Sequence, residues 1–222
     1  MQLIISKIPN PKYIKNIIFD FGDVICDLDR KRTEEKFKEF GAPKSDRIGS
    51  TDEQDFQFHQ IVGRYEMGII TSKEFRKIIK DHYQVAPSDE AVDDAWNALL
   101  LDIPEPRIRL LEQIRKNYRI FMLTNTNEIH YLRYLENLRT HYGYNDFDSL
   151  FEKAYFSYRI GLKKPDIEIF RYVLDNSHLN PTETLFIDDT LMHVESARSI
   201  GIQTHHLQIH EGEQIMDLFR PE

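Results

Sequence analysis

The sequence predicts an α/β protein: a doubly wound parallel sheet with an α-helical segment inserted after the first strand. Short apolar runs alternate with amphipathic stretches along most of the chain. These runs are apolar throughout instead of alternating with polar residues, which is typical of parallel strands that are covered on both faces. The repeated strand–helix–strand order also implies right-handed crossover connections. At 222 residues, the chain is long enough for one such domain with a sizeable insertion.

Five apolar runs are predicted to form the strands of the sheet: 17–21, 119–125, 153–157, 184–188 and 202–207. Helices are predicted between the later strands, at 106–117, 166–177 and 193–201. Pro106 lies near the start of the first of these helices, where its fixed φ is favourable. Gly201 ends the last one and is a typical C-cap residue.

The insertion lies between the first and second strands and shows four helical patterns: 30–41, 52–68, 72–84 and 88–100. Thr71 and Glu74 have the spacing of a capping box, which predicts a helix start at this point. Ligands of open α/β sheets bind at the carboxyl ends of the strands, so this insertion would cover the ligand as a cap. We therefore expect a core formed by residues 1–28 and 106–222, and a helical cap formed by residues 29–105.

The bulk composition argues against several classes of function. The net charge is −8 and no basic block is present, which disfavours nucleic-acid binding. The apolar runs are too short to span a membrane, and the N-terminus does not resemble a signal peptide. A single cysteine, Cys26, excludes an intramolecular disulfide and favours the cytoplasm. We expect Cys26 to be a small buried residue on the first strand, and the partner to be a small molecule.

Polar residues follow four of the predicted strands: Asp20, Thr124-Asn125, Lys163-Lys164 and Asp188-Asp189. Each of these alone is weak evidence, because such residues are common in turns, solvated loops and helix caps. Together they predict a site, because the carboxyl ends of parallel strands meet at one edge of the sheet.

The residue types at this edge suit phosphoryl transfer. Three carboxylates in one cleft cannot all stay ionised without a cation, and oxygen ligands of this kind suit Mg²⁺. A threonine hydroxyl, a backbone N–H and a lysine ammonium suit the remaining oxygens of a phosphate. A carboxylate can attack phosphorus to give an aspartyl phosphate, and Asp20 is the candidate because it follows the first, central strand.

The motifs FDFGDV, LTNTN, GLKKPD and TLFIDDTLMH, with a helical insertion after the first, resemble the haloacid dehalogenase superfamily. Within it the chain is similar to small bacterial sugar-phosphate phosphatases that carry a helical cap of the C1 type. The resemblance covers most of the chain. It implies a Rossmann-like core, a requirement for Mg²⁺ and a phosphatase reaction.

The resemblance also implies a role for each matching residue. Asp20 would be the nucleophile, and Thr124 and Asn125 would bind the phosphate. Lys164, directly before Pro165, would be the base that clamps the phosphate. The implied metal ligands are Asp20, the backbone carbonyl of Gly22, Asp189 as a direct ligand, and Asp188, which would bind the ion or orient water on it.

Two positions depart from the family pattern. The family places a second aspartate, its general acid and base, two residues after the nucleophile, but this chain has Gly22 there. Without that group, we expect the rate to be lower by about 10²–10⁴-fold. Enzymes that resemble this chain and have glycine at the same position are nevertheless similar to phosphatases of hexose 1-phosphates, whose anomeric phosphate has a comparatively good leaving group. Asp23 could substitute for the acid through a shifted loop, but we favour a role as a turn residue that caps backbone N–H groups. His193 could order Asp189 or simply begin the next helix.

The motifs and the resemblance therefore predict a Mg²⁺-dependent phosphatase of a small phosphorylated metabolite, a sugar phosphate of the hexose 1-phosphate type, with selective or slow turnover. Three alternatives stay open: a metal-independent haloacid dehalogenase, a phosphometabolite-binding protein that has lost turnover, and, less favoured, a phosphomutase. In the cap, Arg64, Tyr65 and Glu66 either contact sugar hydroxyls or form a solvated helix end. The oligomeric state is not specified by any pattern.

Overall fold

The computed structural model describes residues 3–6, 11–41 and 53–221. Within these residues, five parallel strands form the central sheet, in the order β4-β3-β2-β5-β6. Their bounds are β2 Asn16–Phe19, β3 Arg119–Thr124, β4 Lys153–Phe156, β5 Thr184–Asp188 and β6 Gln203–His206. The predicted α/β class and parallel sheet are confirmed, and each predicted strand is present to within two residues at either end.

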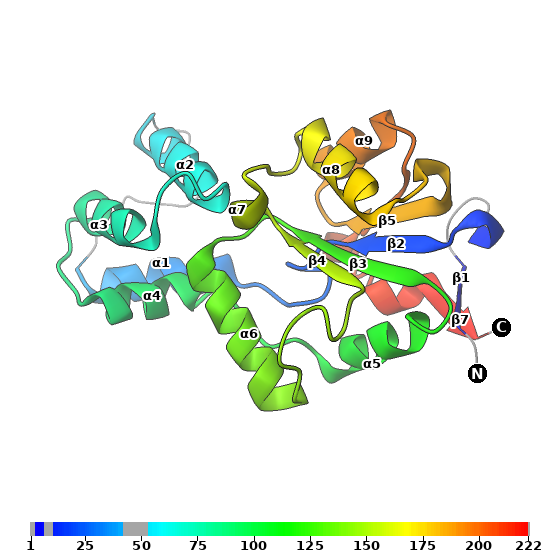
Figure 1. Ribbon diagram of the computed structural model, residues 1–222. Helices are drawn as coiled ribbons and strands as arrows, with labels where there is room; N and C mark the ends of the chain where they lie inside the picture. Colours follow the sequence, from blue (N-terminus) through cyan, green and yellow to red (C-terminus); the bar gives the residue numbers. More distant parts are fainter. Residues whose placement is uncertain (1–2, 7–10, 42–52, 222) are drawn as a thin grey trace.

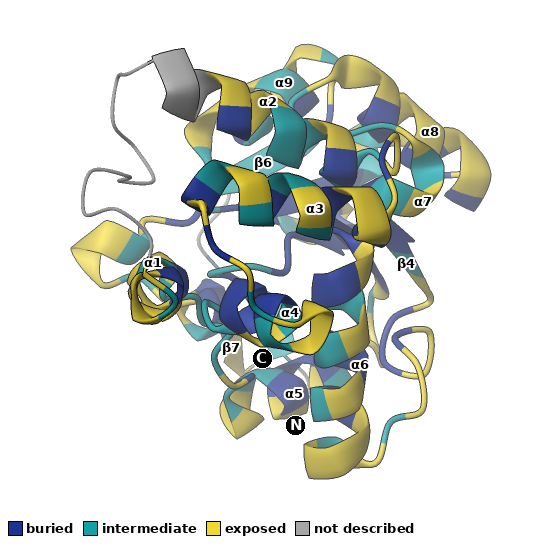
Figure 2. Ribbon diagram, turned by 90° about the vertical axis from the view of Figure 1, so that its left-hand side faces the viewer, coloured by how far each residue is buried: buried dark blue, intermediate teal, exposed yellow. Residues whose placement is uncertain are grey.

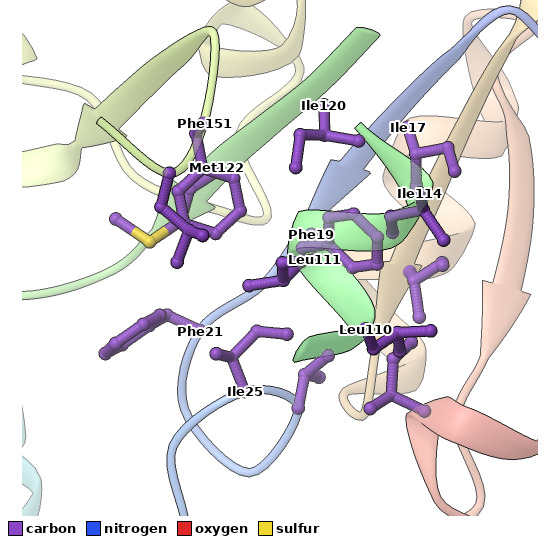
Figure 3. Close-up of a cluster of buried hydrophobic side chains, with 14 of the residues drawn as sticks. Ile17, Phe19, Phe21, Ile25, Leu110, Leu111, Ile114, Ile120, Met122 and Phe151 are labelled. Carbon is purple, nitrogen blue, oxygen red and sulfur yellow. The ribbon is translucent and has the colours of Figure 1, made fainter. Parts of the chain in front are cut away.

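The strands are apolar on both faces because both faces of the sheet are covered. Ile17 and Phe19 of β2 pack in one hydrophobic cluster with Leu111 of α5 (Glu105–Ile114), as Figure 3 shows. The intervening Ile18 packs on the opposite face, in a cluster with Phe170 of α8 (Ile167–Ser177). Successive side chains of a strand point to opposite faces, so a run without polar residues is what this two-sided burial requires.

Helices cover the two faces of the sheet in pairs, as seen in Figure 1. Helices α5 and α6 (Glu128–Tyr142) lie on one side, and α8 and α9 (Leu191–Ser199) lie on the other. The predicted helices at 106–117, 166–177 and 193–201 correspond to α5, α8 and α9. The pattern gave no bounds for α6, whose aromatic and apolar residues are spread around the helix, nor for the single turn α7 (Ser157–Ile160).

A second, two-stranded sheet joins the two ends of the chain, and the sequence did not predict it. Strand β1 (Leu3–Ile5) pairs antiparallel with β7 (Phe219–Pro221). The termini therefore lie together in Figure 1, at the end of the molecule away from α1–α4. The described 3₁₀ helices are η1 (Pro11–Tyr13), η2 (Pro181–Glu183), η3 (Ile209–Glu211) and η4 (Ile215–Leu218).

The inserted segment is helical, and its described helices are α1 (Arg30–Glu39), α2 (Glu53–Glu66), α3 (Ser72–Tyr83) and α4 (Asp89–Asn97). Each coincides with one of the four predicted stretches, although residue 52 lies outside the described residues. The capping box is present: Thr71 accepts a hydrogen bond from the Glu74 backbone N–H, and the Glu74 side chain accepts one from the Thr71 backbone. These helices share a hydrophobic cluster around Phe75, and buried residues line their inner faces in Figure 2. We refer to α1–α4 as the cap; the exact division between cap and core stays a prediction.

The two connections between cap and core run side by side. The Leu101 N–H donates to the Asp27 carbonyl at 3.0 Å, and the Asp29 N–H donates to the Leu99 carbonyl at 2.8 Å. Between them, Leu28 and Leu100 form an isolated antiparallel bridge. The insertion therefore leaves and re-enters the core at one place.

Cys26 is buried, as predicted, but it lies in the loop after β2 and not on the strand. Its thiol contacts the Leu101 carbonyl at 3.4 Å, so it packs beneath the connections to the cap. The strand ends earlier than predicted because β2 stops at Phe19 and a tight turn follows, in which the Cys26 N–H donates to the Phe21 carbonyl at 2.8 Å. None of the described helices combines the length and apolar character that crossing a bilayer requires.

The cap core predicts a large effect of truncating Phe75. This side chain is fully buried, stacks on Tyr65 at 4.1 Å between ring centroids and meets Trp96 edge-on at 4.9 Å. We expect Phe75→Ala to lower the free energy of unfolding by about 3–5 kcal/mol, because it removes these contacts and leaves a cavity. Chemical denaturation measures this, with the exposed Lys77→Ala on the same helix as the control. A loss no larger than that of the control would contradict the packing described here.

Candidate active site

The central strand β2 lies between β3 and β5, and the chain connections diverge on either side of it. In open α/β sheets, ligands bind at such a switch point, beyond the carboxyl ends of the strands. The strand register pairs Phe19 with Ile187, so Asp20 and Asp188 leave the sheet next to each other. The Asp20 N–H donates to the Ile187 carbonyl at 2.9 Å, which holds the two strand ends together.

Lys164 places a buried ammonium between these two carboxylates. Its Nζ lies 2.7 Å from Asp20 Oδ1 and 2.7 Å from Asp188 Oδ2, and its side chain is 1% exposed. Asn125 fixes the backbone of Lys164 from both sides: Asn125 Nδ2 donates to the Lys164 carbonyl at 2.9 Å, and the Lys164 N–H donates to Asn125 Oδ1 at 2.9 Å. The Asn125 side chain therefore positions Lys164, a role that the sequence did not predict, which leaves its backbone N–H for a phosphate.

Asp188 is fully buried, and several donors surround it. Besides Lys164, the Thr190 N–H donates to Oδ1 at 2.7 Å, and His193 Nδ1 lies 3.0 Å from Oδ2. His193 belongs to the first turn of α9 and contacts Asp188 rather than Asp189, with which the sequence had associated it. These contacts suit Asp188 to holding Lys164 in place.

Three carboxylates meet at this edge of the sheet. Ligand oxygens of Asp20, Asp188 and Asp189 all lie within 4.8 Å of one another. Among the described residues, Lys164 supplies a buried ammonium to the group and pairs with Asp20 and Asp188, so three ionised carboxylates carry an excess of negative charge. Such an all-oxygen donor set fits a divalent cation such as Mg²⁺.

The same excess of negative charge shifts the protonation of the carboxylates. Burial, with the charges of Asp188 and Asp189, raises the pKa of Asp20 to about 7, although Lys164 opposes the shift. Burial alone would also raise the pKa of Asp188, but Lys164 and His193 outweigh it and hold that pKa below its ordinary value. Burial and the neighbouring Asp188 raise the pKa of Asp189. Asp188 is therefore the carboxylate that stays ionised beside Lys164.

A cavity of about 270 Å³ lies between the strand ends and the cap. Its floor includes the sequence-predicted residues Asp20, Gly22, Thr124, Asn125, Lys164 and Asp189. Asp188 lies behind this floor, beneath Lys164, and does not line the cavity. The structure thus brings the predicted residues to one place, while their individual roles stay predictions.

The roof and walls contain residues that the sequence did not single out. Helix α2 contributes Phe58, His59, Val62 and Glu66, and the remaining walls include Leu28, Arg30, Trp96, Leu99, His130, Tyr134, Thr190 and His193. The roof residues of α2 recur three and four positions apart, the spacing of one helix face. That periodicity was visible in the sequence, but it did not indicate which helix of the insertion covers the site.

The three cap residues considered from the sequence have different environments. Tyr65 is buried, and its hydroxyl contacts Ser72 at 2.8 Å and accepts from the Ile129 N–H at 3.3 Å, so it is structural. Glu66 lines the cavity and forms an ion pair with Lys163 at 2.7 Å, whereas Arg64 is exposed and is not part of the cavity wall.

The turn after Asp20 places Leu28 beside position 22. A Cβ atom at Gly22 would lie 2.8 Å from Leu28 Cδ1, so Leu28 occupies the adjoining space. Asp23 has a φ of 57°, and its carboxylate accepts from the Leu28 N–H at 3.1 Å and from Arg30 at 2.8 Å. This geometry agrees with the interpretation of Asp23 as a turn residue that caps backbone N–H groups.

Comparison with known proteins gives a consistent family. A model described as haloacid dehalogenase-like hydrolase matches residues 14–201. D-ribitol-5-phosphate phosphatase of Bacteroides thetaiotaomicron is 31% identical over 193 residues, which cover 86% of this chain and 90% of that protein. The crystal structure of a HAD family enzyme from the same organism, in complex with magnesium and inorganic phosphate, is 36% identical with a TM-score of 0.78. It covers 86% of this chain and 93% of its own.

A more distant structure shares the fold alone. L-2-haloacid dehalogenase from Xanthobacter autotrophicus is 15% identical, with a TM-score of 0.57, over 86% of this chain and 76% of that one. The family resemblance predicted from the motifs is confirmed by these comparisons.

The raised pKa of Asp20 predicts how stability depends on pH. Asp20 binds its proton more tightly in the folded protein than in the unfolded chain, so between about pH 4 and pH 7 its contribution to wild-type stability falls as pH rises. Asp20→Asn removes the ionised carboxylate. In EDTA, we expect its stability advantage over the wild type to grow by about 1–2 kcal/mol from about pH 5.5 to about pH 8.

Urea denaturation at the two pH values measures this difference, and the exposed Asp175→Asn is the matched control, with no pH-dependent advantage expected. An advantage of Asp20→Asn that stays constant or shrinks as pH rises would contradict the electrostatics of the site.

Proposed function

Because the chain belongs to the haloacid dehalogenase-like hydrolase family, we propose that it is a Mg²⁺-dependent phosphatase of a small phosphorylated metabolite. One observation carries the proposal: Asp20, Thr124 and Lys164 line one cavity at the switch point of the sheet, with Asp189 beside them. This arrangement combines a nucleophile, groups for phosphate oxygens and a cation site, which phosphoryl transfer requires.

Asp20 is the nucleophile. Its carboxylate oxygen attacks phosphorus, the bond from phosphorus to the ester oxygen breaks, and the electron pair leaves with that oxygen, which takes up a proton. Water then attacks phosphorus in the aspartyl phosphate, the bond to Asp20 breaks, and inorganic phosphate and the free carboxylate are regenerated. Asp20 suits this role because it lines the cavity and is bonded to Lys164 on one oxygen only.

Lys164 and Thr124 stabilise the transferring group. The Lys164 ammonium is held beside Asp20, where it can pair with a phosphoryl oxygen as negative charge develops. Thr124 ends β3 at the cavity floor, so its hydroxyl and the Asn125 N–H are placed to donate to other phosphate oxygens. Asn125 and Asp188 act on Lys164, through its backbone and its ammonium, and not on the substrate.

Asp20, Asp189 and the backbone carbonyl of Gly22 would hold the Mg²⁺ ion, because all three residues line the cavity. When bound, the ion would neutralise charge on the carboxylates and the phosphate. The carboxylates themselves support this assignment, since three of them cluster and Lys164 pairs with Asp20 and Asp188. Asp188 has its oxygens occupied by protein donors, which favours a supporting role over direct ligation.

The substrate we propose is a sugar phosphate or sugar-alcohol phosphate. A cavity of about 270 Å³ fits a metabolite of this size, and its roof offers His59 and Glu66 as polar partners for hydroxyl groups. A similar protein is named for D-ribitol 5-phosphate, and hexose 1-phosphates suit a site that lacks an acid at Gly22. Phosphate release from a panel that contains both ribitol 5-phosphate and hexose 1-phosphates distinguishes these two classes of substrate.

The carboxylate cluster weighs against a haloacid dehalogenase. Displacement at carbon requires no metal and gains nothing from three acids around one lysine. Phosphate release from the panel would indicate the phosphatase, and activity on 2-haloacids in EDTA would indicate the dehalogenase. Activity on neither would indicate a non-catalytic binding protein.

Replacing the nucleophile gives a direct test. We expect Asp20→Asn to lower kcat by at least about 10⁴-fold while the protein stays folded, because an amide cannot form the aspartyl phosphate. Phosphate release measured under saturating substrate checks this. Asp23→Asn is the matched control: its carboxylate is bonded to Leu28 and Arg30, so we expect it to keep most of the activity. Near wild-type turnover in Asp20→Asn would refute the nucleophile.

Metal affinity should depend on pH through Asp20. Burial raises the pKa of this carboxyl to about 7, so below that pH a proton must leave before the cation binds. We expect the Kd for Mg²⁺ to rise by up to about tenfold per pH unit below pH 7, and EDTA to abolish turnover. Calorimetry between pH 6 and pH 8 measures the affinity. In Asp20→Asn, affinity should be weaker and flat over this range, and a flat wild-type profile would contradict the assignment.

A further inference from the structure

Helix α2 places one imidazole in the roof of the catalytic cavity. Phe58, His59, Val62 and Glu66 line the cavity from a single face of this helix, across from Asp20. His59 is exposed, and within the described part of the chain no hydrogen bond or ion pair engages its ring. It therefore presents a free proton donor and acceptor to whatever occupies the cavity.

The proposed reaction needs such a group, because Gly22 supplies none. The leaving oxygen must gain a proton when the phosphate ester is cleaved, and the attacking water must lose one. Gly22 has no side chain to carry a proton, and the side chain nearest to its Cβ position is the apolar Leu28. Asp23 is committed to the Leu28 N–H and to Arg30.

The other protic groups of the roof and entrance are engaged in ion pairs. Glu66 is bonded to Lys163 at 2.7 Å, and Arg30 is bonded to Asp23 at 2.8 Å. Breaking either pair would leave a partner charge uncompensated, which makes these groups poor proton shuttles.

The other titratable groups of the walls are engaged in hydrogen bonds or have their pKa shifted by burial. His130 is buried, with Nδ1 3.1 Å from Asn127 and Nε2 3.1 Å from the Trp96 carbonyl, and burial lowers its pKa to about 4. Burial raises the pKa of Tyr134 well above its ordinary value. His193 is bonded to Asp188. Asp20 and Asp189 also line the cavity, but they are assigned to the nucleophile and the cation, so among the described lining residues His59 is the titratable group that remains to exchange a proton.

We propose that His59 is the general acid and base of this enzyme, an inference that rests on the proposed phosphatase function. In the first step, the imidazolium donates its proton to the ester oxygen as the bond from that oxygen to phosphorus breaks and Asp20 becomes phosphorylated. In the second step, the neutral ring takes a proton from water as the water oxygen bonds to phosphorus and Asp20 leaves. Asp20 lies on the floor and His59 in the roof, so one group serves both steps: in-line displacement brings the water to the side that the alcohol has left.

Esters that differ in their need for a proton test this role. Benzyl phosphate leaves as a strongly basic alkoxide, whereas 4-nitrophenyl phosphate leaves as a stable phenolate, and neither carries sugar hydroxyls that His59 could merely bind. With saturating Mg²⁺, we expect His59→Gln to lower kcat/KM on benzyl phosphate by about 10²–10⁴-fold and kcat/KM on 4-nitrophenyl phosphate by less than about threefold, because kcat/KM reports the step that phosphorylates Asp20 and not the hydrolysis that both esters share. The exposed His141→Gln on α6 should change neither.

A second variant separates proton transfer from a change in shape. In His59→Ala, added imidazole should restore kcat/KM on benzyl phosphate but leave that on 4-nitrophenyl phosphate unchanged. Equal losses of kcat/KM on both esters, or no loss on benzyl phosphate, would overturn the role of His59 and leave the phosphatase function standing. If the wild type releases no phosphate from these esters or from ribitol 5-phosphate and hexose 1-phosphates, the phosphatase function fails, and the role of His59 fails with it.

Discussion

The site depends on one buried ammonium. Lys164 is 1% exposed, and a buried charge costs several kcal/mol unless partners compensate it. Asp188 provides the compensation, and Asn125 holds the backbone so that the ammonium reaches both Asp188 and Asp20. A single positive charge cannot balance every carboxylate of the cluster, and Asp189 adds to the excess. Asp20 consequently has a raised pKa, whereas Asp188 stays ionised beside Lys164, and the roles proposed for Asp20 rest on this difference.

Much of the core could be predicted because local sequence determines it. Parallel strands that are buried on both faces must be apolar throughout, and their carboxyl ends must meet, so Asp20, Thr124 and Asp189 could be associated before any coordinates. The function of Asn125 could not, because its amide is matched to a backbone 39 residues away. The contact between His193 and Asp188 likewise depends on how α9 leaves β5, which no spacing rule specifies.

The cap is joined to the core through the first turns of α6. Ile129 belongs to the hydrophobic cluster of the cap, and the ring of His130 stacks on Trp96 at 5.3 Å between centroids. Arg133 adds an ion pair to Asp94 at 2.8 Å. Because α6 follows directly on the loop after β3, whose last residue is Thr124, these contacts fix the cavity walls relative to the carboxyl end of the sheet. A wall of the cavity that α6 shares with the cap cannot be predicted from sequence patterns read separately in the insertion and in the core.

The antiparallel bridge between Leu28 and Leu100 bears on how an insertion at this point of the chain can change in evolution. An inserted segment whose two ends are adjacent adds little strain to the core, because a short turn could join the same two points of the core without it. An insertion of another length or shape could start and end at the same bridge without changing the register of β2 with β5. The same core can therefore carry different insertions at little cost in stability, and new substrate preferences can arise when one insertion replaces another.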